Sequence, residues 1–186
     1  MRRYGLMAAA FLMLLCAAET ARADVELGAM ATGNFGVGST DVRLPSSWSI
    51  GGLAGYRFKL DILELTPELE LTYLNSSKSL TNGNVDWAFQ ATAGGRAGLA
   101  LGGWVPSAFV HFGLGDVRFE SSDLVRRTKT GPLVEVGGAL DYRLARMISI
   151  GVQVSYSAVR LSDVAQNVGS GSINWVRAGG HLIVLL

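Results

Sequence analysis

Hydrophobic and polar residues alternate along most of the chain with a period of two. From Leu63 to Tyr73 the sequence reads LELTPELELTY, with leucine, proline and tyrosine at odd positions and glutamate or threonine at even ones. Successive side chains of a β-strand point to opposite faces, so one face here is apolar and the other carries three carboxylates. A helix would spread both kinds of residue around its surface. The pattern therefore predicts a strand with two unlike faces.

The same alternation recurs in seven further segments, less regularly in the first and the last. The predicted strands cover approximately residues 25–37, 48–58, 63–73, 85–101, 108–114, 134–144, 148–156 and 172–186. Strands of soluble proteins average about 5–6 residues, whereas a strand that crosses a membrane needs about 9–11. The lengths of these segments favour membrane-spanning strands.

The segments between the predicted strands alternate between long polar connections and short turns. The long connections cover roughly 38–47, 75–84, 116–130 and 159–171, and the short turns lie near 60–62, 102–106 and 145–147. Outer-membrane barrels have long connections at one end and short turns at the other. Backbone groups in hydrocarbon must all be paired, which a closed barrel achieves and an open sheet does not. We therefore predict an all-β fold, an eight-stranded antiparallel up-and-down transmembrane β-barrel.

Two observations favour a barrel whose apolar face points outward, toward lipid. No stretch beyond residue 23 approaches 18 consecutive apolar residues, so a helical membrane span is not predicted. Aromatic residues concentrate near strand ends, as in the girdles at membrane interfaces: Trp48, Phe58, Tyr73, Trp87, Trp104, Tyr142, Tyr156 and Trp175. The alternative is a secreted lipocalin-like ligand binder, in which the apolar face would line the interior.

The first 23 residues predict a secretory signal peptide. Arg2 and Arg3 precede an apolar stretch over 6–18, and Ala21-Arg22-Ala23 fits an A-x-A cleavage site. The mature barrel domain would then cover 24–186, beginning at Asp24. Cys16 follows a leucine, whereas a lipoprotein signal places a small residue before its cysteine, so lipidation is not favoured.

The composition of the chain excludes several classes of protein. The formal net charge is +1, which provides no basic surface for nucleic acid, and the single cysteine excludes a disulfide scaffold. Only 17% of the residues are charged and 49% are hydrophobic, which argues against a disordered chain. The 24 glycines suit a narrow barrel, where interior side chains crowd one another.

The polar faces of the strands predict a network of charged side chains inside the barrel. Its members are Arg57, Lys59, Glu64, Glu68, Glu70, Arg96, His111, Glu135, Asp141, Arg143 and Gln153. Eight strands leave an interior that side chains just fill, and buried charges must be paired. We therefore favour a structural network over an ion path or a catalytic carboxylate pair. The three glutamates of 63–73 require Arg57, Lys59, Arg96 or Arg143 opposite them.

The candidate chemistry is sparse. A lipid A deacylase of the barrel type needs a His-x-Ser pair, because serine requires a base within hydrogen-bond reach. Neither His111-Phe112-Gly113 nor His181-Leu182-Ile183 provides one, so we predict no enzyme activity and no catalytic, cofactor or metal site. The 116–130 connection is mixed in charge and suits either solvation or contact with lipopolysaccharide phosphates or an adhesion partner. Its charged residues are Glu120, Asp123, Arg126, Arg127 and Lys129.

These features together resemble the small outer-membrane β-barrel superfamily, which includes the OmpA transmembrane domain and the OmpX and opacity-type proteins. The likeness is clearest over 131–159, which resembles two strands joined by a tight turn. The last strand resembles the signal read by the barrel-assembly machinery, through Arg177, Gly179, Leu182, Val184 and Leu186. The chain ends in leucine where the family usually has phenylalanine or tryptophan.

The resemblance implies a monomer without cofactor in the outer membrane of a Gram-negative-type cell. Its expected partners are outer-membrane lipid, lipopolysaccharide and, during insertion, the assembly machinery. The implied role is structural, in envelope integrity or surface contact, with a lumen plugged by side chains. A small ion-conducting pore and a lipid A-modifying enzyme remain as alternatives.

Overall fold

The computed structural model describes residues 23–37, 44, 46–76, 85–120, 126–161 and 171–186. The predicted signal peptide, with Cys16, lies outside these residues. Within them, no helix is long and apolar enough to span a membrane.

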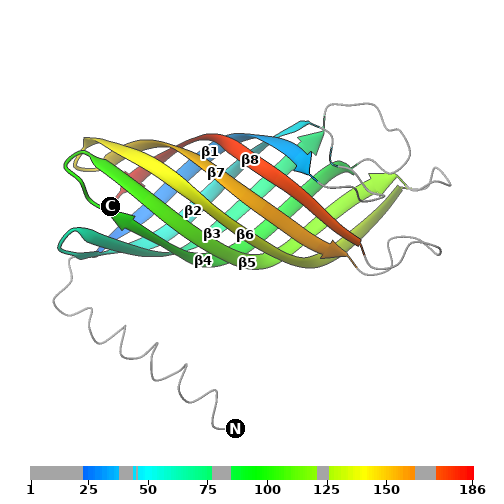
Figure 1. The fold of residues 1–186 in the computed structure, drawn as a ribbon, viewed down its shortest axis with the longest axis horizontal. Coiled ribbons are helices and arrows are strands. Elements are labelled where there is room, and N and C mark those ends of the chain that lie inside the picture. Colours follow the sequence, from blue (N-terminus) through cyan, green and yellow to red (C-terminus); the bar gives the residue numbers. More distant parts are fainter. Residues whose placement is uncertain (1–22, 38–43, 45, 77–84, 121–125, 162–170) are drawn as a thin grey trace, which may run out of the picture.

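Eight antiparallel strands form a closed barrel in which each strand pairs with its neighbours in the sequence (Figure 1). Pairing of the first strand with the last closes the sheet, so the predicted fold class is confirmed. The strands are β1 (Ala23–Val37), β2 (Ser47–Leu60), β3 (Leu63–Ser76), β4 (Val85–Leu99), β5 (Trp104–Glu120), β6 (Arg126–Ala145), β7 (Ile148–Leu161) and β8 (Gly171–Leu185).

Three short turns connect β2 to β3, β4 to β5 and β6 to β7, at the end of the barrel where the chain terminates (Figure 1). Two of them use a residue with positive φ, at Asp61 (57°) and Gly102 (65°). The left-handed region costs glycine little and is tolerated by aspartate. We call this end the turn end and the opposite end the loop end.

The predicted connections 116–130 and 159–171 are too long, because the strands continue into them. β5 and β6 remain paired from Asp116 with Thr130 to Glu120 with Arg126, and β7 extends to Leu161. The charged segment predicted as a loop therefore lies largely on two strands, with Arg127 and Lys129 on β6. Asp123 lies outside the described residues.

The apolar face of the strands points outward. Leu69, Phe112 and Val152 are 61%, 58% and 60% exposed although each lies in the middle of a strand. An apolar band of this kind on the outside of a closed barrel is suited to lipid. This orientation is the reverse of the lipocalin-like alternative, which is therefore wrong.

The interior changes from polar in the middle of the barrel to apolar at the loop end. We call the apolar part the apolar layer: Leu44, Leu74, Val85, Ala88, Val117, Leu133, Val159, Leu161, Ile173 and Trp175. Two predictions are corrected here. Trp175 is 1% exposed and lies in this layer, not in an interfacial girdle. Val85 points inward because a register shift between Val85 and Trp87 reverses the alternation at the start of β4.

Candidate functional site

The candidate site is the polar interior of the barrel. All the side chains predicted to form the network belong to the inward face of their strands, and most of them are buried. Lys59 and Arg143 are more exposed, at 35% and 24% of their side chains, because they lie close to the turn end. The structure adds Asp24, Glu26, Arg177 and His181 to the predicted set.

Ion pairs at the turn end connect β1, β2, β3 and β6. Arg57 contacts Glu26 through Nε and lies 3.7 Å from Glu64, which also contacts Arg143. Glu64 is thus paired with two of the cations expected opposite it. Lys59 contacts Asp24 at the rim, rather than a glutamate of β3.

The middle of the network joins β3, β4, β6 and β8 through Arg96. Its guanidinium lies 3.3 Å from Glu68 and 3.7 Å from Asp141, and 5.5 Å from the centre of the Phe109 ring. Asp141 also contacts His181 Nε2. Arg96 therefore links two carboxylates that lie on strands far apart in the sequence.

Arg177 on β8 is the most deeply buried cation, with 0% exposure of its side chain. It contacts Glu135 and lies 2.7 Å from Glu70, two carboxylates on β6 and β3. Its Nε donates to Ser155 at 3.3 Å. Sequence analysis assigned Arg177 only to the assembly signal. The apolar residues on either side of it face outward, so its inward direction follows from the same alternation.

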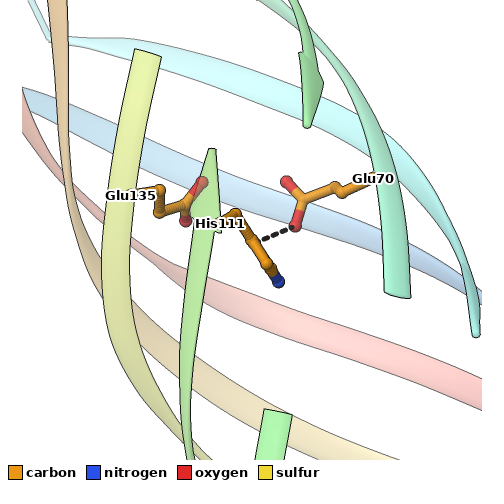
Figure 2. A group of neighbouring side chains, drawn as sticks. All are labelled: Glu70, His111 and Glu135. Carbon is orange, nitrogen blue, oxygen red and sulfur yellow. Dashed lines mark ion pairs between the residues drawn. The ribbon is translucent and has the colours of Figure 1, made fainter. Parts of the chain in front are cut away.

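His111 on β5 lies between Glu70 and Glu135 (Figure 2). Its Nε2 is 2.8 Å from Glu68, whereas Nδ1 has no hydrogen-bond partner among the described residues and lies 3.8 Å from Glu70. Gly94 is paired with His111 in the sheet, and a Cβ there would come within 2.7 Å of His111 Cα. The glycine thus leaves room for the imidazole to lie against β4.

The remaining predicted residues fall into two groups. Gln153 faces inward, where its amide lies 3.6 Å from Met30 Sδ. Of the predicted assembly signal, Leu182 and Leu186 are exposed on the outside, at 46% and 66%. The backbone of Leu186 exchanges two hydrogen bonds with Val25 on β1, at 2.9 and 3.3 Å.

The numbers of acidic and basic side chains in the network differ among the described residues. With all six buried carboxylates ionised, the network has two more negative charges than its four guanidiniums neutralise, so other cations or protons must balance them. The carboxylates are Glu26, Glu64, Glu68, Glu70, Glu135 and Asp141, and the guanidiniums are Arg57, Arg96, Arg143 and Arg177. Within the same part of the chain, no hydroxyl is hydrogen-bonded to either histidine ring. The arrangement is suited to holding cations and offers no activated serine.

We expect Arg96→Ala to destabilise the barrel by about 2–3 kcal/mol, because charged hydrogen-bond partners would be left buried. Unfolding by urea in lipid vesicles, followed by the shift of the unboiled band on a cold SDS gel, measures this. Arg118→Ala is the matched control: Arg118 lies 3.8 Å from Asp86 and both are about one-third exposed, so about 0–1 kcal/mol is expected. Equal losses in the two variants would contradict a structural role for the Arg96 pairs.

Comparison with known proteins places the chain among outer-membrane barrels. The family model described as "Outer membrane protein beta-barrel domain" matches residues 7–175. No curated protein sequence matches the chain. The crystal structure of Neisserial surface protein A is similar, with a TM-score of 0.62 and 11% identity over 88% of this chain and 98% of that one. The N-terminal β-barrel domain of Pseudomonas aeruginosa OprF has a TM-score of 0.52 and 16% identity, over 90% and 100%.

Proposed function

Because this chain belongs to the family of outer membrane protein β-barrel domains, we propose that it is a non-conducting barrel that supports the envelope and offers surface contacts. The observation that supports this most directly is the filled interior. The ion-pair network occupies the middle of the lumen, and the apolar layer lies between that network and the loop end.

The two parts of the interior would oppose ion flow for different reasons. An ion in the middle of the barrel would have to displace paired guanidiniums and carboxylates, such as Arg177 with Glu135. An ion at the loop end would lose its water among residues such as Leu133, Val159 and Trp175, which are at most 1% exposed. Apolar constrictions close pores by excluding water. The barriers lie in series, so both must open before ions pass.

We expect the purified barrel to produce no regular conductance steps in a planar lipid bilayer. A large porin inserted under the same conditions is the control for sensitivity. Trp175→Ala and Arg96→Ala, each alone, should also remain silent, since one barrier is left in each. Regular steps from the wild-type barrel would overturn the proposed function in favour of the small pore.

Surface contact is supported by the length of the β5–β6 hairpin. These strands have 17 and 20 residues, whereas about 9–11 suffice to cross a membrane. The hairpin would therefore extend beyond the lipid at the loop end, where Lys129 and Thr130 could meet lipopolysaccharide or another cell. Lys129→Glu should reduce such contacts with lipopolysaccharide without affecting the heat-dependent mobility of the barrel.

The export, assembly and chemistry of the protein complete the proposal. Residues 1–23 are removed on export, so the intact mass of the outer-membrane form should correspond to a chain starting at Asp24. The signal for the assembly machinery consists of Arg177, Gly179, Leu182 and Val184 on the closing strand and of Leu186 directly after it. The barrel acts as a monomer and modifies no lipid, so lipid A from cells with and without the protein should be identical.

A further inference from the structure

We propose that Glu70, His111 and Glu135 form a site for one divalent transition-metal ion inside the barrel (Figure 2). The three residues come from β3, β5 and β6, all are buried, and one ligand atom of each lies within 4.8 Å of the others. Imidazole nitrogen and carboxylate oxygen are ligands for zinc and its neighbours in the first transition row. The inference goes beyond the proposed function, because a closed structural barrel requires no metal.

Each of the three residues is anchored through one atom, while another atom points toward the proposed site. Glu135 contacts Arg177 through Oε1, and its Oε2 is buried without a hydrogen-bond partner in the part of the chain that the structure describes. Glu70 Oε1 accepts from Thr72 at 2.7 Å and lies 2.7 Å from Arg177, whereas Oε2 faces His111. A buried acceptor without a donor is costly, so the uncommitted oxygen indicates a missing positive partner.

His111 has the surroundings of a metal-binding histidine. Its Nε2 lies 2.8 Å from Glu68 Oε1, and a carboxylate that accepts from one ring nitrogen leaves the lone pair of the other available. That other nitrogen, Nδ1, is buried and has no hydrogen-bond partner among the residues described. It lies 3.8 Å from Glu70 Oε2, too far for a hydrogen bond. A zinc ion bonded to both would hold them about 3.4 Å apart. Side-chain rotations could supply this closer approach.

The charge of the network supports a divalent ion. The two negative charges left by four guanidiniums against six carboxylates equal the charge of one such ion. The competing explanation is protonation, either of His111 and His181, each beside a carboxylate, or of two of the buried carboxylates themselves. The two explanations differ experimentally, because only a metal site depends on His111 and not on His181.

The test uses the full mature barrel, folded in detergent and treated with Zn²⁺ or Co²⁺ either after folding or during refolding, because the site is buried. We expect one ion per wild-type barrel, and the same for His181→Gln, the matched control. His111→Gln and Glu135→Gln should weaken binding at least about 100-fold, and Glu68→Gln, which only positions the imidazole, about 10–100-fold. A heat-dependent shift on a cold SDS gel shows that each variant is folded.

X-ray absorption of the zinc-loaded wild type tests the site without any variant. One imidazole among oxygen ligands is expected; no imidazole, or more than one, would overturn the proposal. No uptake under either loading condition, or equal loss of binding in His111→Gln and His181→Gln, would also overturn it. Conductance of the metal-free barrel is a separate measurement, so a failure of this proposal is distinguishable from a failure of the proposed function.

Discussion

Replacing Arg177 with methionine is expected to lower the free energy of unfolding by about 3–5 kcal/mol, the range for removing one partner of a buried ion pair. Methionine fills a similar length of the lumen, so the loss would arise mainly from charge. In the metal-free barrel without this guanidinium, Glu70 and Glu135 would face each other across the interior as buried carboxylates with no cation held between them. Two like charges at 4% and 0% exposure cannot be screened by water.

Urea unfolding in lipid vesicles measures this loss of free energy, and two further variants test whether it arises from an unpaired buried charge. Lys59→Met removes a cation whose side chain is 35% exposed at the rim, so less than about 1 kcal/mol is expected. Adding Glu70→Gln and Glu135→Gln to the Arg177 variant should restore most of the stability, because neither of the two positions that lost the guanidinium then carries a charge. If the triple variant were as unstable as the single one, packing rather than charge would explain the effect of Arg177.

The period of two in the sequence was sufficient to predict the strands and the outward face. Alternation within a strand is local geometry, so LELTPELELTY fixes the direction of Glu68 and Leu69 without any knowledge of their neighbours. The short turns near 60–62 and 145–147 lie between strands as predicted, whereas the turn near 102–106 was predicted to extend too far, because β5 already begins at Trp104. The eight strands and the closed barrel are accordingly as predicted.

The contrast between a polar and an apolar face is lost where the interior itself becomes apolar. At the loop end, Trp175 and Val159 point inward although they are hydrophobic, since the lumen there contains the apolar layer. The assignment of Trp175 to an interfacial girdle was therefore wrong, although alternation places it on the same inward face as Arg177. Val85 is a different case, because a register shift turns it inward, and a register shift leaves no mark in the alternation.

The partners within the network could not be predicted from the pattern alone. Glu70 pairs with Arg177 across the lumen, between β3 and β8, which are not adjacent strands. Such contacts depend on how the strands tilt and stagger around the barrel, whereas alternation predicts only the face of the sheet on which a side chain lies. The proposed metal site could not be predicted for the same reason. Glu70, His111 and Glu135 lie on three strands, without the local spacing of a metal-binding motif.

Leu69→Arg is expected to destabilise the barrel in lipid by about 2–4 kcal/mol, the range for an arginine facing lipid at the middle of a bilayer. Leu69 lies halfway along β3 and is 61% exposed on the outer face. Leu144→Arg is the matched control, because Leu144 is also 61% exposed but lies next to the turn between β6 and β7. There the arginine can reach the interface, and a loss of only about 0–1 kcal/mol is expected.

The difference between these two variants tests the membrane orientation itself. If the outer face met water, a charge at either position would be solvated and the two variants would be equally stable. In lipid, the cost depends on depth, so unfolding in vesicles must separate Leu69→Arg from Leu144→Arg. Repeating the measurement in thinner bilayers should reduce the difference, because an arginine at Leu69 is then closer to the interface. Equal stabilities in vesicles would contradict a barrel whose exposed leucines face hydrocarbon.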